Sequence, residues 1–263
     1  MLKHYLRFYR TVVLVNVTRA MQYRLDFLVG IFATVGWTVI TMVFLAAIFG
    51  KVPNIAGWTY FELIALLGFY RLIEGIGEFI FYRSFKKFSE DIRRGRLDML
   101  LTKPVDFQFY VSIRFITIDA ISSALAGLAI FWYGLKHSAY VFTPAALAAF
   151  GGLCLSGFLI HYSLWVFVHA FNFWLVKVNN LRNLIHGLVG TTRFPPEAYG
   201  RRAEVFMSFV IPLALIAAFP VKTLLNRSEW WYLPFSLFIS LVFLILSRKF
   251  FYFALKSYSS EGG

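Results

Sequence analysis

Long apolar runs alternate with short polar segments along most of the chain, and their lengths predict membrane-spanning helices. Such runs cover residues 25–48, 60–82, 111–135, 144–174 and 232–255. A helix needs about 20 apolar residues to cross the hydrocarbon core of a bilayer. Each run is long enough to do so. The pattern therefore predicts an all-α polytopic membrane protein, folded as a single domain over residues 1–263.

Residues 175–230 contain two alternative candidates for one further crossing. Residues 203–219 are nearly free of charge but are interrupted by Pro212, whereas residues 178–194 are short and polar. Helices broken by proline are tolerated at membrane depth where protein or a water-filled cavity covers their backbone. If the more polar segment crosses, residues 193–230 form a re-entrant region on the outer side. Either alternative gives six membrane-embedded helical regions.

The first 24 residues show a different pattern, which is typical of a helix lying flat on a membrane. Aromatic and aliphatic side chains alternate there, and Lys3, Arg7 and Arg10 recur at i, i+4 and i+7. A helix of this kind buries its apolar face in the interface and keeps its basic groups in water. We therefore expect an interfacial elbow helix over residues 1–24.

A basic segment, residues 83–105, separates the second apolar run from the third. Phe85, Phe88 and Ile92 recur at i, i+3 and i+7, which places them on one face of a short helix. Gly95 is predicted to end this helix, with basic residues in its last turn. A second short apolar turn follows. Two helical turns are thus held outside the bilayer, and their apolar edges need a partner. The basic side chains on the other faces are Lys86, Lys87, Arg93 and Arg94.

Composition agrees with a membrane location. The chain is 59% hydrophobic and 15% charged, which is far more apolar than a soluble domain of this length needs. Its formal net charge of +13 raises the question of nucleic-acid binding. However, the sequence contains no zinc-finger, helix-turn-helix or RNA-binding pattern. No nucleic-acid partner is therefore predicted.

The distribution of basic residues predicts the orientation in the membrane. They cluster before the first apolar run, between Arg83 and Lys103, and after the last run. The two short loops on the other side hold only Lys51 and Lys136. By the positive-inside rule, both termini and the basic segment are cytoplasmic.

Ionisable side chains also occur inside the apolar runs. Arg71, Glu74 and Glu78 recur at i, i+3 and i+7 and share one helical face. Charged groups at membrane depth are costly unless they pair or meet water, and Arg71 is spaced to bridge Glu74. We give equal weight to two interpretations, which are a polar lining of a pathway or subunit interface and an internal ion pair that fixes helix packing. Asp119 joins this set of polar candidates and is interpreted as a member of a salt bridge.

The sequence contains no motif for nucleotide binding or catalysis. A P-loop, Gly-x-Ser-x-Gly, His-Glu-x-x-His and Cys-x-x-Cys are all missing, so the chain is not expected to be an enzyme or to bind ATP. Cys154 is the only cysteine, which excludes an internal disulfide. His161 and His169 have no partner at metal-ligand spacing. We interpret both as hydrogen-bonding groups in a packed helix and expect no metal or cofactor on this chain.

The basic segment contains RRGRLDMLLTKPV, from Arg93 to Val105. This run resembles the cytoplasmic coupling segment of type-2 ABC exporter permeases, and more specifically the bacterial six-span group with the pattern RRGxLDxLLxKP. The motif is short, but the order of apolar runs around it agrees with that family over most of the chain. The resemblance implies a membrane-spanning permease subunit that forms half of a translocation pathway in the bacterial inner membrane.

The same resemblance implies the partners. In that family the coupling segment docks into a groove on a separate ABC-type ATP-binding subunit, present in two copies, which holds ATP and Mg²⁺. A second permease subunit, identical or paralogous, supplies the other half of the pathway, and membrane lipid surrounds the pair. The expected coupling interface of this chain consists of Phe85, Lys86, Lys87, Phe88, Ile92, Arg93, Arg94, Leu97 and Asp98.

A further resemblance concerns the C-terminal third. RFPPEAY followed by VIPLALIAAFPVKTLL resembles the outer segment of type-2 exporters, where a Phe-Pro motif ends the fifth span and helices re-enter the outer leaflet. It slightly favours the re-entrant alternative for residues 193–230, although Arg193, Arg201 and Arg202 would then lie outside. The residues that mark this segment are Phe194, Pro195, Pro196, Pro212 and Pro220.

Two other function classes compete with this hypothesis. A proton-coupled secondary transporter would use Arg71, Glu74 and Glu78 as a relay, but such proteins carry inverted repeats, and no internal repeat is visible. An intramembrane enzyme needs a convergent acid–base pair, for which Glu74 with His161 is the candidate. The abundant aromatic residues suit lipid contact and interface belts, so they do not identify a cargo.

Overall fold

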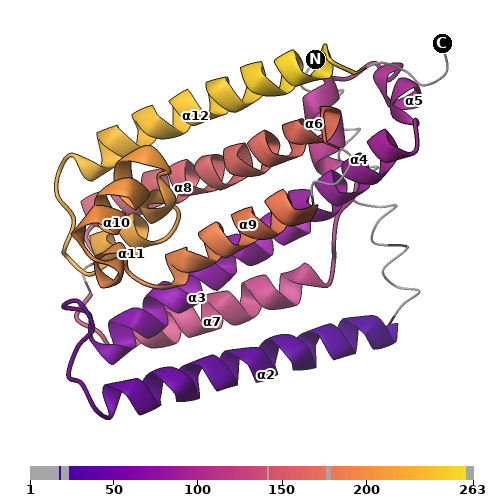
Figure 1. The fold of residues 1–263 in the computed structure, drawn as a ribbon. Helices are drawn as coiled ribbons and strands as arrows, with labels where there is room; N and C mark the ends of the chain where they lie inside the picture. Colours follow the sequence, from indigo (N-terminus) through magenta and orange to yellow (C-terminus); the bar gives the residue numbers. More distant parts are fainter. Residues whose placement is uncertain (1–17, 19–23, 141, 176–178, 259–263) are drawn as a thin grey trace.

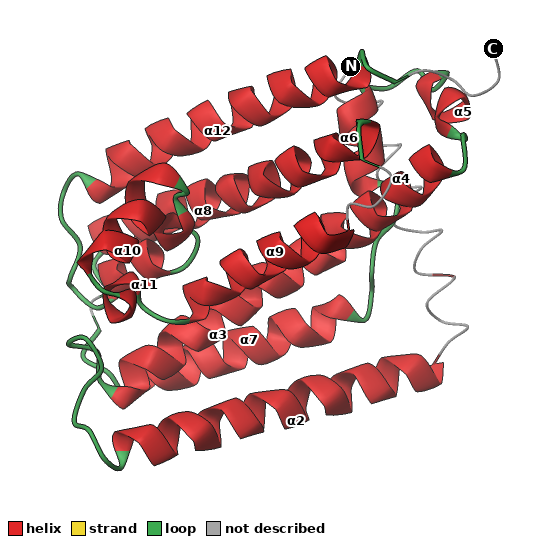
Figure 2. Ribbon diagram, viewed as in Figure 1, coloured by secondary structure: helices red, strands yellow, loops and turns green. Residues whose placement is uncertain are grey.

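The protein is a bundle of long helices that lie side by side (Figure 1). The computed structural model describes Thr18 and residues 24–140, 142–175 and 179–258. Within these residues every regular element is a helix, which confirms the all-α class (Figure 2). The elbow helix expected over residues 1–24 lies almost entirely outside the described residues. The long helices are α2 (Arg24–Phe49), α3 (Tyr60–Gly77), α7 (Ala120–Lys136), α8 (Pro144–Ala170), α9 (Asn179–Gly190) and α12 (Tyr232–Leu255).

Shorter helical segments occupy the two ends of the bundle (Figure 1). The basic end holds α4 (Arg83–Arg93), α5 (Leu97–Leu101) and α6 (Phe107–Ile113). The opposite end holds α10 (Arg201–Val205) and α11 (Ala218–Leu224). The short 3-10 and π segments are η1 (Glu78–Tyr82), η2 (Phe171–Phe173), η3 (Thr191–Arg193), η4 (Pro196–Tyr199), η5 (Phe206–Val210) and η6 (Leu213–Leu215).

Several predicted apolar runs coincide with helices. The ends of α2 and α12 agree within one residue with the predicted ranges 25–48 and 232–255. α8 begins at Pro144, a residue that fits a first helical turn. The Thr143 hydroxyl caps this helix by accepting a hydrogen bond from the backbone N–H of Ala146 at 3.1 Å. The start predicted for the fourth run is therefore confirmed.

In the described part of the chain, two helices are long and apolar enough to cross a membrane by length and composition alone, namely Pro144–Phe173 and Tyr232–Leu255. Among the described residues, Gly36–Phe49 and Ala120–Lys136 form shorter apolar helices. The count of six membrane-embedded regions stays a prediction.

Helices α3 and α7 run antiparallel in direct backbone contact, because glycines spaced seven residues apart line both of them. A Cβ atom on Gly68 would lie 2.2 Å from the α7 backbone, and one on Gly127 would lie 2.4 Å from the α3 backbone. Gly75 and Gly134 approach the facing backbone at 2.6 and 2.3 Å by the same measure. Positions seven apart lie on nearly the same face of a helix. These glycines therefore set the separation of the two helices.

The second apolar run continues without a break into the basic segment. α3 passes into the π-type turn η1 and then into α4, and Tyr82 and Arg83 at the junction keep right-handed helical backbone angles. The predicted short helix is thus the last part of one continuous helical rod, residues 60–93, which we call the rod. Gly95, with φ of 62°, follows its end as predicted, because glycine adopts this left-handed conformation without steric cost.

The third apolar run is not one helix, so the prediction for residues 111–135 is wrong. A non-helical stretch separates α6 from α7. There the Ser84 hydroxyl accepts a hydrogen bond from the Phe115 N–H at 2.8 Å and lies 2.9 Å from the Phe115 carbonyl, to which it donates. The Thr117 N–H donates to the Phe79 carbonyl at 3.1 Å. Groups on the rod thus satisfy backbone atoms that a continuous helix would have paired internally.

Residues 203–219 do not form a single crossing helix. They contain the end of α10, η5, a break at Ile211 and Pro212, and η6, and they gather at the end opposite α4 (Figure 1). Ile211 is extended, with φ −113° and ψ 95°, as expected for a residue before proline. α9 runs beside α8 along the bundle instead (Figure 1). The structure therefore has the interrupted arrangement, and its depth in a membrane stays a prediction.

The residues that mark this interrupted region pack into the fold. Phe194 is half-buried against the largest apolar cluster. The buried members of the predicted set are Pro195, Pro196, Pro212 and Pro220. Burial of proline needs no partner for a backbone N–H, because proline has none.

Two ion pairs anchor the same region. Arg227 pairs with Glu62 at 2.8 Å and donates a hydrogen bond to the Gly57 carbonyl at 3.0 Å, which ties the segment after α11 to the start of α3. Lys222 on α11, which is only 8% exposed, pairs with Glu197 on η4. The end of the bundle that contains α10 and α11 is thus stabilised by ion pairs as well as by apolar packing.

We expect the substitution Gly127→Ala to destabilise the bundle, because the new methyl group would overlap the α3 backbone. Overpacking of this kind typically costs about 1–3 kcal/mol. Gly151→Ala is the matched control, since a Cβ atom there meets nothing within 4 Å and alanine favours a helix over glycine. Thermal unfolding in detergent measures both. Equal melting temperatures for the two variants would contradict the packing described.

Candidate functional site

The apolar face of α4 is covered by the chain itself. Phe85, Phe88 and Leu97 are each 0% exposed. The Phe88 ring packs against Phe107 of α6 and Phe251 of α12, with centroids 6.2 and 5.8 Å apart. Burying such a side chain stabilises a fold by about 1.5–3 kcal/mol. The expectation that these apolar edges need another protein is therefore wrong for Phe85, Phe88 and Leu97, because the chain's own helices cover them.

Two histidines connect α8 to the rod. The His161 Nε2 atom lies 2.9 Å from the Tyr82 hydroxyl, and the His169 Nδ1 atom lies 3.0 Å from the Ser89 hydroxyl. His169 also stacks on Phe85, with ring centroids 4.9 Å apart. Both histidines are hydrogen-bonding groups in a packed helix, as predicted.

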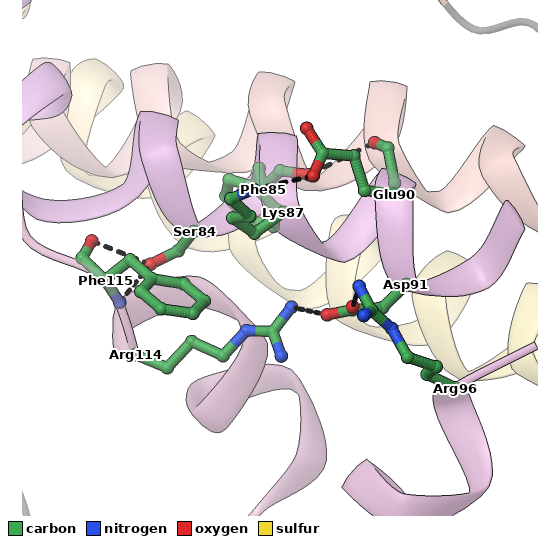
Figure 3. Close-up of polar contacts among 9 residues, drawn as sticks. Ser84, Phe85, Lys87, Glu90, Asp91, Arg96, Arg114 and Phe115 are labelled. Atoms are coloured by element: carbon green, nitrogen blue, oxygen red, sulfur yellow. Dashed lines mark hydrogen bonds and ion pairs between the residues drawn. The ribbon is translucent and has the colours of Figure 1, made fainter. Parts of the chain in front are cut away.

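A buried carboxylate fixes the end of the rod to the link between α6 and α7. Asp91 on α4 is 8% exposed and pairs with Arg114 and, at 2.6 Å, with Arg96 (Figure 3). The Arg114 side chain is 7% exposed. Figure 3 shows Ser84 holding Phe115 on the same side of the rod. Where water is largely excluded, each of these charges depends on the other for compensation.

A second carboxylate joins α6 to α12. Asp106 caps α6 by accepting from the Phe109 N–H at 2.9 Å, and it also accepts from Arg248 at 2.6 Å and from the Tyr252 hydroxyl at 2.9 Å. Partial burial by itself raises the pKa of Asp106, but these hydrogen bonds outweigh it and the pKa is lowered. The ionised group therefore contributes stability above its ordinary pKa of about 4, and this is lost as the pH falls through the lowered value.

Several side chains of the basic segment are exposed, and we define its tip as the exposed side chains Arg93, Arg94, Asp98, Met99 and Leu101. Met99 is 70% exposed and Leu101 is 43% exposed. The first three belong to the predicted interface. Met99 was missed because α5 is too short for periodicity to show which side faces inward.

The other predicted interface residues lie elsewhere. Lys86 and Lys87 line a cavity beside the rod. Lys87 pairs with Glu90 at 2.7 Å, and this hydrogen bond lowers the pKa of Glu90. Ile92 is half-buried against the apolar cluster around Phe88. The predicted interface is therefore divided among the tip, the cavity and the interior.

The cavity beside the rod has a volume of about 770 Å³. The rod contributes Arg71, Glu74 and Glu78 to its wall, so the structure brings these predicted polar residues together. α9 contributes Arg182 and His186. This wall is polar and charged in a protein whose long helices are otherwise apolar.

The predicted bridge within α3 is confirmed. Arg71 and Glu74 are 3.1 Å apart, and the Tyr70 hydroxyl donates to the other Glu74 oxygen at 2.9 Å. Arg71 and Glu74 also line a second cavity of about 190 Å³, on whose wall Trp37 of α2 and Arg193 lie. The pair therefore fixes packing and borders two cavities at once.

Asp119 lines neither of the two cavities. It is exposed immediately before α7 and takes part in no ion pair with a described residue. The predicted salt bridge is therefore wrong, because the break between α6 and α7 places Asp119 at the start of a helix instead of inside one.

We expect Asp91→Asn to destabilise the protein strongly, because it leaves the buried Arg114 guanidinium without its compensating charge. Removing one partner of a buried pair costs about 3 kcal/mol or more. Glu90→Gln removes a carboxylate one residue away, whose partner Lys87 is 43% exposed, and should cost less than about 1 kcal/mol. Unfolding in denaturant measures both, and a similar loss in the two variants would contradict the role given to Asp91.

The chain matches a family model over most of its length. Residues 35–262 match the model of the ABC-2 family transporter proteins. The matched range includes the rod, its tip and both cavities. Searches of curated proteins and of solved structures returned no match. By the extent of the family match, this chain belongs to the ABC-2 family of transporter proteins.

Proposed function

We propose that this chain is the membrane-spanning permease subunit of an ABC exporter, and that it forms half of a translocation pathway driven by a separate ATPase subunit. Membership of the ABC-2 family makes it a membrane component of a transporter that works with an ATP-binding subunit. One observation carries the finer proposal. The charged cavity wall lies along one continuous helical rod, and the exposed tip follows directly after the end of that rod.

The tip has the composition of a docking surface. Arg93 and Arg94 supply positive charge beside the exposed apolar side chains of Met99 and Leu101. Interfaces of this kind combine an apolar contact with charges that guide the partner. The buried residues Phe85, Phe88 and Leu97 contribute indirectly, because they hold the tip in place from inside.

The rod provides a route for mechanical coupling. In the proposed cycle, ATP closes two copies of the nucleotide-binding subunit, which hold ATP and Mg²⁺, and each copy pushes one tip. α4 cannot move without η1 and α3, since no loop separates them. The displacement therefore reaches Glu78 and Glu74 at the cavity wall. Two states with different contacts at the tip are sufficient for such a switch.

The cavity supports a pairing of permease subunits. It is charged and only partly enclosed by this chain, and charged groups at membrane depth need water or a polar partner. A second copy, or a paralogue, facing the same wall would enclose a complete pathway. In this assembly the interrupted helices after α9 lie at the outer gate, and membrane lipid contacts the apolar outer surface.

The proposed orientation places the tip in the cytoplasm. Basic residues of α4, of the segments on either side of α5 and of the end of α12 gather at this end of the bundle, and the positive-inside rule makes it the inner side. Both termini are then cytoplasmic, and the protein lies in the bacterial inner membrane. The outward direction of transport rests on the resemblance of the RRGRLDMLLTKPV run to exporter permeases.

We expect Arg93→Glu/Arg94→Glu to prevent assembly with the ATP-binding subunit, because it reverses the charge of the tip while both side chains are exposed. The readouts are co-purification and ATP hydrolysis by the partner in lipid nanodiscs, and both should fall to the level of the partner alone. Arg201→Glu/Arg202→Glu makes the same change on exposed side chains of α10 at the opposite end. Full association of the tip variant, or an equal loss in the α10 variant, would overturn the proposed docking surface.

A further inference from the structure

The cavity beside the rod carries more positive than negative charge. Five basic and three acidic side chains line it, an excess of two positive charges. Two of the acidic groups are already engaged, since Glu74 pairs with Arg71 at 3.1 Å and Glu90 pairs with Lys87 at 2.7 Å. The excess therefore resides in the remaining basic groups.

Three basic side chains on the cavity wall form no ion pair within 4.0 Å in the described part of the chain. We call Arg83, Lys86 and Arg182 the cavity cations. Glu78 is the lining carboxylate that is likewise unpaired among the described residues. A concave site with one dominant sign of charge and low-dielectric walls concentrates ions of opposite sign.

The cavity cations come from two walls. Arg83 and Lys86 lie on α4, and Arg182 lies on α9. An acidic group between the walls would contact both. Guanidinium groups bind phosphate and carboxylate oxygens in a bidentate manner, and an ammonium group adds a compact point charge.

Aromatic rings form the neighbouring surface of the same cavity. Tyr82 and His186 line it and are partly exposed, and both pack against the buried Trp165, with ring centroids 4.1 and 4.6 Å away. The exposed parts of these two rings offer contact area to the organic part of a ligand whose acidic end meets the cations. The wall therefore suits an amphiphile with an acidic end better than a purely apolar molecule.

We propose that this cavity binds the acidic, phosphate-type group of the transported molecule. That the bound molecule is cargo rests on the proposed function, whereas the binding itself does not need the ATP-binding subunit. Arg83 and Lys86 lie on the rod, whereas Arg182 lies on α9. A displacement of the tip therefore changes the distances between these cations and weakens their binding of the acidic group.

The test measures binding to the purified full-length chain in detergent by native mass spectrometry. The probes are phosphatidylglycerol, phosphatidylcholine with the same acyl chains, and inorganic pyrophosphate. Phosphatidylglycerol should be retained about tenfold more strongly than phosphatidylcholine, as expected for one or two charge-assisted hydrogen bonds. Equal retention of the two lipids would overturn the proposal.

The cavity variant Arg83→Gln/Lys86→Gln/Arg182→Gln should lose this preference. Glu78→Gln should instead strengthen binding of phosphatidylglycerol, because it removes the unpaired carboxylate, and a misfolded protein would not show this gain. The proposal would be overturned if Glu78→Gln did not strengthen binding of phosphatidylglycerol and the triple variant still preferred this lipid to phosphatidylcholine.

A second triple variant controls for lipid bound outside the cavity. Lys249 and Lys256 line a separate groove along α12, and Arg202 is exposed at the opposite end. The variant Arg202→Gln/Lys249→Gln/Lys256→Gln removes the same number of charges and should keep the preference. Loss of the preference in this control would place the lipid on the outer surface and overturn the proposal.

Pyrophosphate distinguishes the two sources of the acidic group. If it displaces phosphatidylglycerol, the phosphate itself is the recognised part. If the lipid stays bound, the acyl chain is also required. Both outcomes support an acidic ligand. Failure of lipid binding while the partner ATPase is still stimulated would overturn this inference alone and leave the coupling role intact.

Discussion

The backbones of α3 and α7 are in direct contact, and this contact determines where the other helices can lie. Gly68 and Gly127 leave no room for a side chain, so neither helix can rotate against the other without a clash. Between helices surrounded by lipid there is no hydrophobic drive to associate, and close packing of small residues takes its place. The α3 half of the rod and α7 therefore form one rigid pair, against which the other elements are positioned.

Ion pairs with buried members fix the short segments at the two ends of the bundle. Asp91 and Arg114 hold the α4 half of the rod to the link between α6 and α7, and Arg227 with Glu62 holds the interrupted segment to the start of α3. The side chains of Asp91, Arg114 and Glu62 are largely buried, so the charge of each needs its partner. The tip, the cavity wall and the interrupted segment are thus connected to one helical rod. This arrangement is consistent with a protein that receives a displacement at one end and must respond at the other.

The sequence correctly predicted those features that depend on contacts between residues close together in the chain. Gly95 ends the rod, Thr143 and Pro144 begin α8, and Arg71 bridges Glu74, since in each case the determining atoms lie within a few residues. The glycines of α3 and α7 also carried a readable signal, because they are seven residues apart in both helices. The contact between α3 and α7 was nevertheless not predicted from this spacing.

The features that sequence missed depend on distant contacts. The apolar run 111–135 is long enough for one helix, and the break within it is stabilised by Ser84 and Phe79 of the rod. Periodicity likewise showed that Phe85 and Phe88 share a face, but not that α6, α8 and α12 cover it. A periodic pattern identifies which face is apolar, whereas the identity of its neighbour is a property of the whole fold.

The proposed coupling requires that force applied at the tip moves the cavity wall. Spin labels at Lys86→Cys on α4 and Asn183→Cys on α9, in a Cys154→Ser background, report the distance across the cavity by pulsed electron paramagnetic resonance. In the complex with the ATP-binding subunit, this distance should shift when ATP is added and return after hydrolysis. An unchanged distance distribution during ATP hydrolysis would contradict the account.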